Sequence, residues 1–434
     1  MTTATWLPLV LGYLIPVGFF LLGWGGMEPE RARRATAHGL LALALAALGY
    51  FAVGFAFHLG GAAVVADLPG LVGLDRLVGH RVEAGLYWGV IGLDGFFLAG
   101  DADTPDALIL FAIYLPAVAT AVLLSTLGFP GRGQGRHTTL IGLLVSAVAF
   151  PLAACWAWGG GWLAGLGKTV QTGHGMVDFA GSGVVYLLSG AVALGGMVAA
   201  GRRSSEQGPA EVPPAHFPLL AGLGALLVTV GWLGWSLGTP FHTAGARLDA
   251  GRVAVNGVLA MASATLTCLA YCWLTLGHGE PLMVSRGSVA GLVAISAAAP
   301  FLPPWAALVV GGIAGLLLPL GVYLIDRLLR LDDRTAAVAT TALSGLWGLL
   351  AVAFFADGRW GQGWNGVGPE MYRTVAGQGV TGWLAAPGFI GDGPGQAIAQ
   401  VAGLAAISAL GFLVGWLATQ ALKAIDRATR PSGD

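Results

Sequence analysis

Apolar stretches of about 20 residues recur from one end of the chain to the other, and a helix of that length can cross the hydrocarbon core of a bilayer. Reading the apolar runs between charged or Pro/Gly-rich breaks gives about eleven spans, near 5–26, 36–59, 106–128, 138–162, 177–200, 215–238, 252–276, 287–302, 305–325, 335–356 and 396–422. The runs are continuously apolar rather than alternating, which disfavours a β-barrel. The sequence therefore predicts an all-α polytopic membrane protein that forms a single domain over residues 1–434.

The composition also indicates that lipid surrounds the chain. Of the 434 residues, 56% are hydrophobic and 10% are charged, and the mean hydropathy is +0.76. A water-soluble chain of this length normally carries far more charge. The 71 glycines suit helices that pack closely in lipid. The net charge of −1, without a basic stripe, argues against nucleic acid as a partner.

No motif in the chain indicates an enzyme. Nucleophile elbows, P-loops and metal-ligand spacings are missing from the sequence, so we predict no catalytic residue, cofactor or metal. Cys155, Cys268 and Cys272 all fall in apolar segments, where we expect them to fill the core.

The distribution of basic residues predicts the orientation in the inner membrane. With the N-terminus outside and the C-terminus in the cytoplasm, 14 of the 21 basic residues fall in cytoplasmic connections, as the positive-inside rule requires. The segment 1–26 lacks a basic region before its apolar run, so we interpret it as the first span rather than a signal peptide. Three outer connections are long, 60–105, 163–176 and 357–395, and we expect them to cap the outer face.

The sharpest local signal is an acid at the start of a small-residue helix, Asp178–Tyr186 (DFAGSGVVY). An acidic side chain at membrane depth is costly unless it has a partner, which makes Asp178 a functional candidate. The alternative is that its carboxylate caps the free N–H groups of the helix start. Both interpretations remain open at this stage.

A second acid begins a similar helix near the other end of the chain. Asp333 precedes Thr341 by eight residues, as Asp178 precedes Tyr186, and eight helical residues rise about 12 Å, towards mid-bilayer. By the charge bias, the first helix enters from outside and the second from the cytoplasm. This pattern predicts inverted five-helix repeats, about 5–203 and 215–356, followed by a last helix at 396–422 and a central path at the repeat interface.

The chain resembles the ammonium transporter/Rhesus channel family. The resemblance rests on the Asp178–Arg203 segment and on further matches in order along almost the whole chain, at 158–161, 231–239, Asn256, 287–294 and 327–333. It implies eleven helices, a homotrimer, and one narrow conduction path in each subunit for ammonium or ammonia. A PII-type regulator is a common partner in the family. It would dock near 129–137 or 201–214, although the short tail after the last span makes this partner doubtful here.

The resemblance also assigns roles to single residues. Trp158 and Thr239 match the outer vestibule, where a cation meets a π-face and an oxygen, and Asp178 stands beside them. Trp235 matches one of two stacked gate residues. The other gate position falls near Leu115 or Pro116 and is not aromatic, which departs from the family pattern. Asp333 is the structural acid at the cytoplasmic start of its helix.

The middle of the expected pore departs further from the family. Members usually place two hydrogen-bonded histidines there, and this chain has Tyr186 and Thr341 instead. Neither side chain titrates near neutral pH, so proton relay is not expected. All eight histidines fall near helix ends or in loops, where we interpret them as interfacial; His174 alone stands close enough to Asp178 to face the vestibule.

Three functions follow. The first is a transporter or channel for ammonium/ammonia that passes a neutral species. The second is a non-conducting sensor or binding protein, since Tyr186 is larger than imidazole and can fill the lumen. The third is a channel for another small neutral solute.

Overall fold

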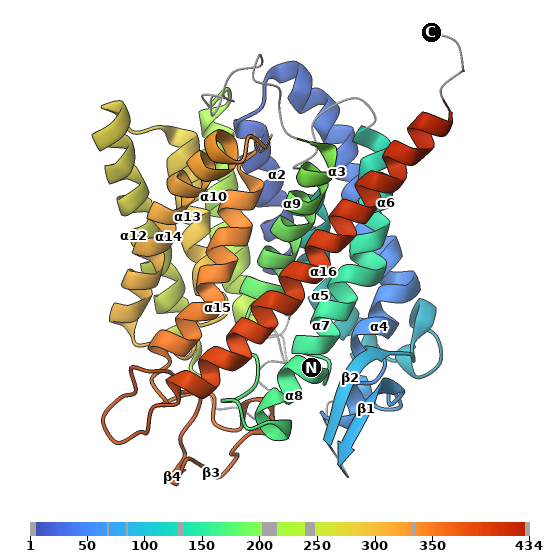
Figure 1. The fold of residues 1–434 in the computed structure, drawn as a ribbon, viewed down its shortest axis with the longest axis vertical. Coiled ribbons are helices and arrows are strands. Elements are labelled where there is room, and N and C mark those ends of the chain that lie inside the picture. The colour runs from blue at the N-terminus through green and yellow to red at the C-terminus, as the bar shows by residue number, and fades with distance from the viewer. Residues whose placement is uncertain are drawn as a thin grey trace.

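The computed structural model describes residues 6–66, 69–83, 86–127, 134–201, 215–238, 248–331, 333 and 335–429. Within them, nine helices are long and apolar enough to cross a membrane by length and composition: Leu7–Gly25, Pro29–Val64, Pro105–Leu127, Gly135–Ala157, Ser182–Ala200, Pro218–Gly238, Ala250–Leu276, Pro304–Leu328 and Gly393–Ala428. Two shorter apolar helices, Pro281–Ile295 and Ala339–Phe355, lie where the other two spans are expected. The prediction of an all-α polytopic membrane fold is confirmed (Figure 1).

The helices have the following bounds. They are α1 (Trp6–Gly12), α2 (Leu14–Gly25), α3 (Pro29–Gly49), α4 (Phe55–Leu59), α5 (Pro105–Leu127), α6 (Gln134–Leu144), α7 (Phe150–Ala157), α8 (Trp162–Thr169), α9 (Leu188–Ala200), α10 (Pro218–Gly238), α12 (Ala250–Leu276), α13 (Pro281–Ile295), α14 (Pro304–Tyr323), α15 (Ser344–Phe355) and α16 (Gly393–Ala428). In the part of the chain that the structure describes, five π-helical segments lengthen or join them, at Tyr50–Gly54, Val145–Ala149, Ser182–Leu187, Leu324–Leu328 and Ala339–Leu343. Two of these, Ser182–Leu187 and Ala339–Leu343, lead into α9 and α15, and such segments are frequent at functional sites.

The two longest outer connections contain strands that the apolar pattern did not predict. β1 (Leu77–Glu83) and β2 (Leu86–Gly92) form an antiparallel hairpin, with Leu77 opposite Gly92. Gly89 of β2 also bridges to Gly161, just before α8, and so fixes the hairpin to the helices. In the second connection, β3 (Met371–Tyr372) pairs with β4 (Val375–Ala376). Both strand pairs lie at one end of the bundle, called the hairpin end below, and the end of α16 lies at the other, called the C-terminal end (Figure 1).

The last helix, α16, shows the directions of α9 and α15. Gln400, near its start, donates to the carbonyl of Val177 before α9, while Lys423, near its end, donates to the carbonyl of Ala200 at the end of α9. α9 therefore runs from the hairpin end to the C-terminal end. α15 runs the opposite way, because its C-terminal end lies beside the start of α16. Two hydrogen bonds join these ends: the carbonyl of the C-cap residue Ala356 accepts from Gly382, and the carbonyl of Gly382 accepts from Asp392 at the start of α16.

Close packing between α16 and α9 depends on small residues. A Cβ added to Gly415 would lie 1.9 Å from the carbonyl oxygen of Val192, and one added to Gly195 would lie 2.1 Å from that of Phe412. Backbones approach this closely only where there is no side chain, which explains glycine at both positions.

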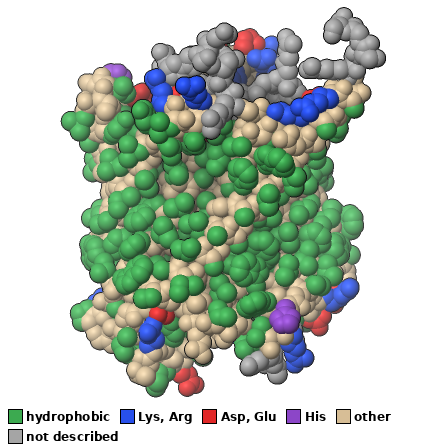
Figure 2. Space-filling view, in the orientation of Figure 1, with side chains coloured by type: hydrophobic (Ala, Val, Ile, Leu, Met, Phe, Trp, Pro, Cys, Tyr) green, Lys and Arg blue, Asp and Glu red, His purple; other side chains and the backbone are tan. Residues whose placement is uncertain are grey.

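The surface has the pattern of a membrane protein. Hydrophobic side chains cover the middle of the molecule, and charged side chains gather at its two ends (Figure 2). Large apolar residues are strongly exposed on the outer helices, among them Leu219 and Leu274 at 87% and 88%. Such a surface is stable only against lipid or another apolar partner, so the chain is a multi-pass membrane protein.

Candidate pore site

Asp178 forms the start of the first half of the site. One carboxylate oxygen, Oδ2, accepts the backbone N–H groups of Gly183 (3.0 Å) and Val184 (2.8 Å). Gly181 allows this turn because its φ is 95°, a left-handed conformation that side chains disfavour. These are the hydrogen bonds that the capping interpretation predicts. Attraction of a cation by Asp178 stays a prediction.

Asp333 forms the corresponding start on the other side. Its Oδ1 accepts from the backbone of Ala337 (2.9 Å) and its Oδ2 from that of Val338 (3.0 Å). Each of the two acids therefore accepts hydrogen bonds from N–H groups at the start of its helix, which have no carbonyl partner within the helix. Because the two helices run in opposite directions, their polar starts lie at opposite ends of the bundle.

Three large aromatic side chains form what we call the aromatic cage: Tyr114, Trp158 and Trp235. Their ring centroids are 5.8–6.4 Å apart. Both indoles donate to backbone carbonyls of the Asp178 turn. Trp158 donates to the carbonyl of Asp178 (2.7 Å), and Trp235 donates to the carbonyl of Ala180 (3.0 Å). The cage is thus fixed to the same turn that Asp178 caps.

Tyr114 is the aromatic residue that sequence reasoning missed. It is fully buried on α5 and lies against both tryptophans, whereas Leu115 is half-buried and Pro116 packs near Gly12 of α1. The aromatic side chain that packs on Trp158 and Trp235 is thus Tyr114, and the assignment of Leu115 or Pro116 to the second gate position stays a prediction. The signal was present in the sequence, since Tyr114 is the aromatic residue immediately before the two positions considered.

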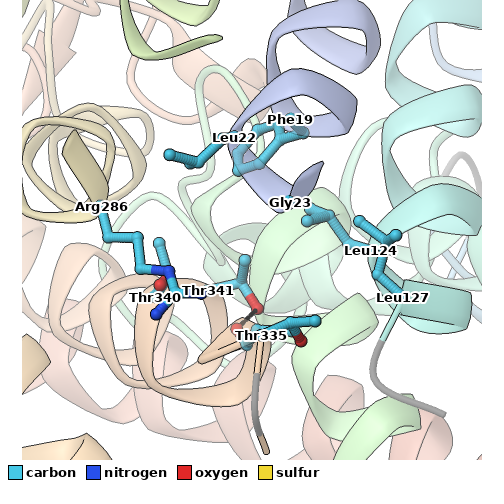
Figure 3. A pocket seen from close by; sticks show the side chains of 10 residues that line it. Phe19, Leu22, Gly23, Leu124, Leu127, Arg286, Thr335, Thr340 and Thr341 are labelled. Carbon is cyan, nitrogen blue, oxygen red and sulfur yellow. Dashed lines mark hydrogen bonds between the residues drawn. The ribbon is translucent and has the colours of Figure 1, made fainter. Parts of the chain in front are cut away.

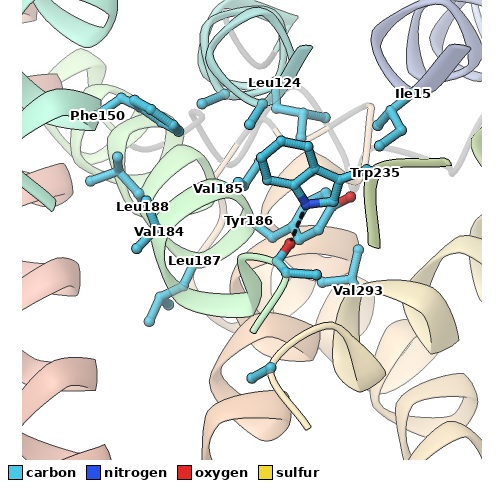
Figure 4. Close-up of a cluster of buried hydrophobic side chains, with 14 of the residues drawn as sticks. Ile15, Leu124, Phe150, Val184, Val185, Tyr186, Leu187, Leu188, Trp235 and Val293 are labelled. Carbon is cyan, nitrogen blue, oxygen red and sulfur yellow. Dashed lines mark hydrogen bonds between the residues drawn. The ribbon is translucent and has the colours of Figure 1, made fainter. Parts of the chain in front are cut away.

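Tyr186 lies between the cage and the opposite end of the bundle. Tyr186 is buried, with 2% of its surface exposed, and it packs on Phe19 of α2 with ring centroids 5.9 Å apart. Figure 4 places Tyr186 and Trp235 in one cluster of buried side chains, with Ile15 and Leu124 beside them. At this level the molecule is closely packed.

Thr341 lies about one helical turn beyond Tyr186. A Cβ added to Gly190, four residues after Tyr186, would lie 2.6 Å from the Thr341 hydroxyl oxygen. That hydroxyl donates to the carbonyl of Ala337 at 2.7 Å, so its proton is used within its own helix. Its oxygen keeps the capacity to accept a hydrogen bond.

A small cavity of about 30 Å³ lies beside Thr341, and we call it the threonine cavity (Figure 3). Its polar side chains are Thr335, Thr340, Thr341 and Arg286, and its other lining residues are apolar or glycine. The cavity reaches Phe19 and Thr341, but Tyr186 does not line it. Tyr186 packs on Phe19, which lines this cavity, and clusters with Trp235 of the aromatic cage, so it lies between the two.

Two histidines depart from the interfacial positions expected for them. His58 is fully buried at the end of α4; it shares a hydrogen bond of 2.9 Å with the Tyr50 hydroxyl, and its ring lies 4.7 Å from that of Tyr114. His174 is also fully buried, but its ring lies 4.3 Å from that of Tyr372 in the outer connection. The span pattern placed both near helix ends, and only the packing of the connections buries them.

Thr239, assigned to the vestibule by resemblance, lies outside the described residues, as do 128–133 and 202–214, which make up most of the expected regulator-docking connections. Among the described residues, no group of three or more His, Cys, Asp or Glu side chains could hold a metal ion. The three cysteines are buried, as expected of core residues.

The fold and the site define a class: a helical membrane protein with two opposed helices, each started by an acid, and a polar position between them. The chain belongs to the ammonium transporter family, whose members are not enzymes; the model of the Ammonium Transporter Family matches residues 5–427.

Relatives agree with this assignment. The chain is 32% identical to ammonium transporter Amt2 of Archaeoglobus fulgidus over 81% of its own length and 71% of the relative. It is 27% identical to Amt1 of the same organism over 96% and 90%.

Solved structures share the fold. A sensor Amt protein has a TM-score of 0.73 at 23% identity, covering 97% of this chain and 92% of that one. Candida albicans Mep2 has a TM-score of 0.69 at 23% identity, covering 97% and 82%.

Proposed function

We propose that this protein passes ammonia across the inner membrane as a neutral species, entering at the hairpin end outside the cell and leaving at the C-terminal end in the cytoplasm. The named relatives are ammonium transporters, which supports ammonium/ammonia as the substrate. The aromatic cage supports a recruiting site, because a cation over indole gains roughly 0.5–2 kcal/mol. That gain is far below the cost of carrying a charge through hydrocarbon.

One observation carries the proposal: the polar position between the two opposed helices consists of Tyr186 and Thr341, one turn apart, with no imidazole at either residue. A phenol and a hydroxyl hydrogen-bond a neutral solute but do not exchange a proton near neutral pH. Ammonium must therefore lose its proton before this level. Movement of the Tyr186 ring would open the path between the cage and the threonine cavity.

A second candidate is a non-conducting sensor or binding protein. The close packing of Tyr186 on Phe19 favours it, since a ring that never moves would leave a binding site at the cage and no flux. A channel for another small neutral solute is the third candidate, because the Thr341 oxygen does not distinguish ammonia from similar molecules.

Flux into proteoliposomes separates these candidates. Purified protein would be tested with ammonium and methylammonium while internal pH and membrane current are recorded together. We expect internal alkalinisation from ammonia entry without a current. Alkalinisation at the rate of empty vesicles, together with saturable ammonium binding, would favour the sensor.

The double substitution Tyr186→His with Thr341→His tests the mechanism. We expect it to introduce an ammonium-dependent current that the parent lacks, because two imidazoles provide a proton path. The matched control makes the same exchanges on α12, Tyr271→His with Thr275→His, and should behave as the parent. A robust ammonium current in the parent would contradict our account of these two positions.

A further inference from the structure

One segment of the last outer connection has a strained backbone. Residues 363–377, which we call the outer flap, contain β3 and β4 and lie at the hairpin end (Figure 1). The two residues that join β3 to β4 are Arg373 and Thr374, with φ of 47° and 66°. Turns of this kind favour asparagine and glycine, because a β-branched side chain such as that of threonine rarely adopts a positive φ. The outer flap therefore depends on other contacts to keep this turn in place.

Hydrogen bonds attach the outer flap to two other parts of the molecule. Tyr372 donates to one carboxylate oxygen of Asp392 at the start of α16, and Arg373 donates to the other oxygen. Near the beginning of the flap, Asn365 donates to the backbone carbonyl of His174 at 2.8 Å. The flap is thus held on α16 and on the segment that leads into the pore site.

His174 lies beneath the hairpin of the outer flap. Its side chain is fully buried, and the ring of Tyr372 packs on it with centroids 4.3 Å apart. Neither ring nitrogen of His174 has a hydrogen-bond partner among the described residues. A protonated imidazole carries a charge and two N–H donors, which need water or an acceptor. Burial accordingly lowers the pKa of His174 to about 3.

The charged groups around the hairpin are engaged elsewhere or exposed. From α16, Asp392 is 5% exposed and accepts from both Tyr372 and Arg373. Lys168 of α8 is exposed and lies near Gly366 of the flap, and Glu370 within the flap is exposed as well. A proton on His174 therefore requires Tyr372 to move and water to enter.

We propose that the outer flap is an acid-released cover, in which protonation of His174 displaces Tyr372 and detaches the hairpin from the segment before Asp178. The direction follows from linkage. The buried imidazole binds a proton only at very low pH, whereas an imidazole in water binds one near neutral pH, so acid favours the open flap. The closed flap keeps its full stability above a pH of about 6.5 and loses stability as pH falls towards 3. This inference does not depend on which solute the protein passes.

Hydrogen exchange of the outer flap measures its release. Amide exchange of peptides from residues 363–377 would be followed by mass spectrometry in detergent from pH 7.5 to pH 5, after correction for the intrinsic pH dependence of exchange. With a pKa of 6.5 for an open imidazole and about 3 for the buried one, the open fraction should rise about 30-fold over this range. Peptides from α9 should stay protected, which separates local opening from global unfolding.

Two histidine variants test the assignment to His174. His174→Phe keeps a ring beneath Tyr372 but cannot bind a proton, so the rise in exchange should disappear. His80→Phe removes an exposed histidine of β1 in another outer connection and should behave as the parent. An equal rise in His174→Phe, or a parent flap whose exchange does not depend on pH, would overturn the proposal.

A second measurement leaves His174 unchanged and remains available if His174→Phe does not fold. Asp392→Asn weakens the hydrogen bonds from Tyr372 and Arg373, so the flap should exchange faster than in the parent already at pH 7.5. The further rise towards pH 5 should persist, because the histidine is still present. Exchange equal to the parent at pH 7.5 would show that Asp392 does not hold the flap, and loss of the rise in acid would assign the titration to the carboxylate; either result would overturn the proposal.

Discussion

At the scale of single residues, His174 shows how burial of an ionisable group couples stability to pH. Its backbone is held by Gln396 and Asn365, and both of its ring nitrogens are buried without a hydrogen-bond partner among the described residues. Burial lowers the pKa of the His174 imidazole to about 3. The adjoining Tyr372 hydroxyl donates to Asp392, which also pairs with Arg373, and burial raises the pKa of Tyr372.

This burial predicts a loss of stability in mild acid. Below a pH of about 6.5 the unfolded chain binds a proton at His174 that the folded protein does not, so stability falls as pH drops from about 6.5 towards 3. The difference amounts to about 2 kcal/mol at pH 5. Thermal unfolding in detergent between pH 5 and 8 would measure it, with His174→Phe expected to lose this part of the slope. An unchanged slope in His174→Phe would show that His174 is not protonated on unfolding in this range.

At the scale of elements, α16 positions the start of the Asp178 turn through two buried glutamines. Gln400 accepts from the backbone N–H of Val177 and donates to the carbonyls of Val177 and Leu349, each at 2.8 Å. Gln396 holds the neighbouring residues His174 and Gly175 in the same way. One side chain therefore joins α16, α15 and the segment before Asp178.

We expect Gln400→Leu to destabilise the protein by about 3 kcal/mol or more, because three buried backbone groups lose a partner and each unsatisfied group costs about 1–3 kcal/mol. Gln420→Leu, the same exchange further along α16, should change stability by less than about 1 kcal/mol. Unfolding midpoints of purified protein in detergent measure both. Equal unfolding midpoints for the Gln400→Leu and Gln420→Leu proteins would mean that water satisfies the backbone groups that lose Gln400 as a partner.

At the scale of the whole molecule, a buried ion pair joins segments that are far apart in the chain. Arg252 of α12 donates to Asp357, just after α15, at 2.5 Å, and the side chains are 9% and 3% exposed. Arg252 also donates to the carbonyl of Leu302, and Asn256 donates there too. The beginning of the long outer connection is thereby fixed to the helices. Assembly of such subunits into a homotrimer stays a prediction of the resemblance.

Removing one partner of this pair should cost more than removing both. Asp357→Leu leaves a buried guanidinium uncompensated and should destabilise by about 3–5 kcal/mol, whereas Asp357→Leu with Arg252→Met should recover a large part of that loss. The exposed pair Arg136–Asp426 provides the control, where Asp426→Leu should cost no more than about 1 kcal/mol. A double variant less stable than Asp357→Leu would contradict this expectation, because it would show that Arg252 stabilises the fold even without Asp357, through contacts such as its hydrogen bond to the carbonyl of Leu302.

The sequence alone determined the spans and the two acid-started helices. Hydrophobic length and the need to satisfy backbone N–H groups are local constraints, so runs of apolar residues and the positions of Asp178 and Asp333 could be read directly. The start of α13 differs from the prediction. α13 begins earlier than its apolar run, because Pro281 and Glu280 initiate a helix irrespective of hydropathy.

Only the tertiary structure decided which side chains meet. Tyr114 joins Trp158 and Trp235, and Arg286 reaches the threonine cavity, through packing between helices that are more than 40 residues apart in the chain. His58 becomes buried for the same reason. Contacts of this kind depend on the rotation and depth of each helix, which the packing of small residues sets and which hydropathy does not encode.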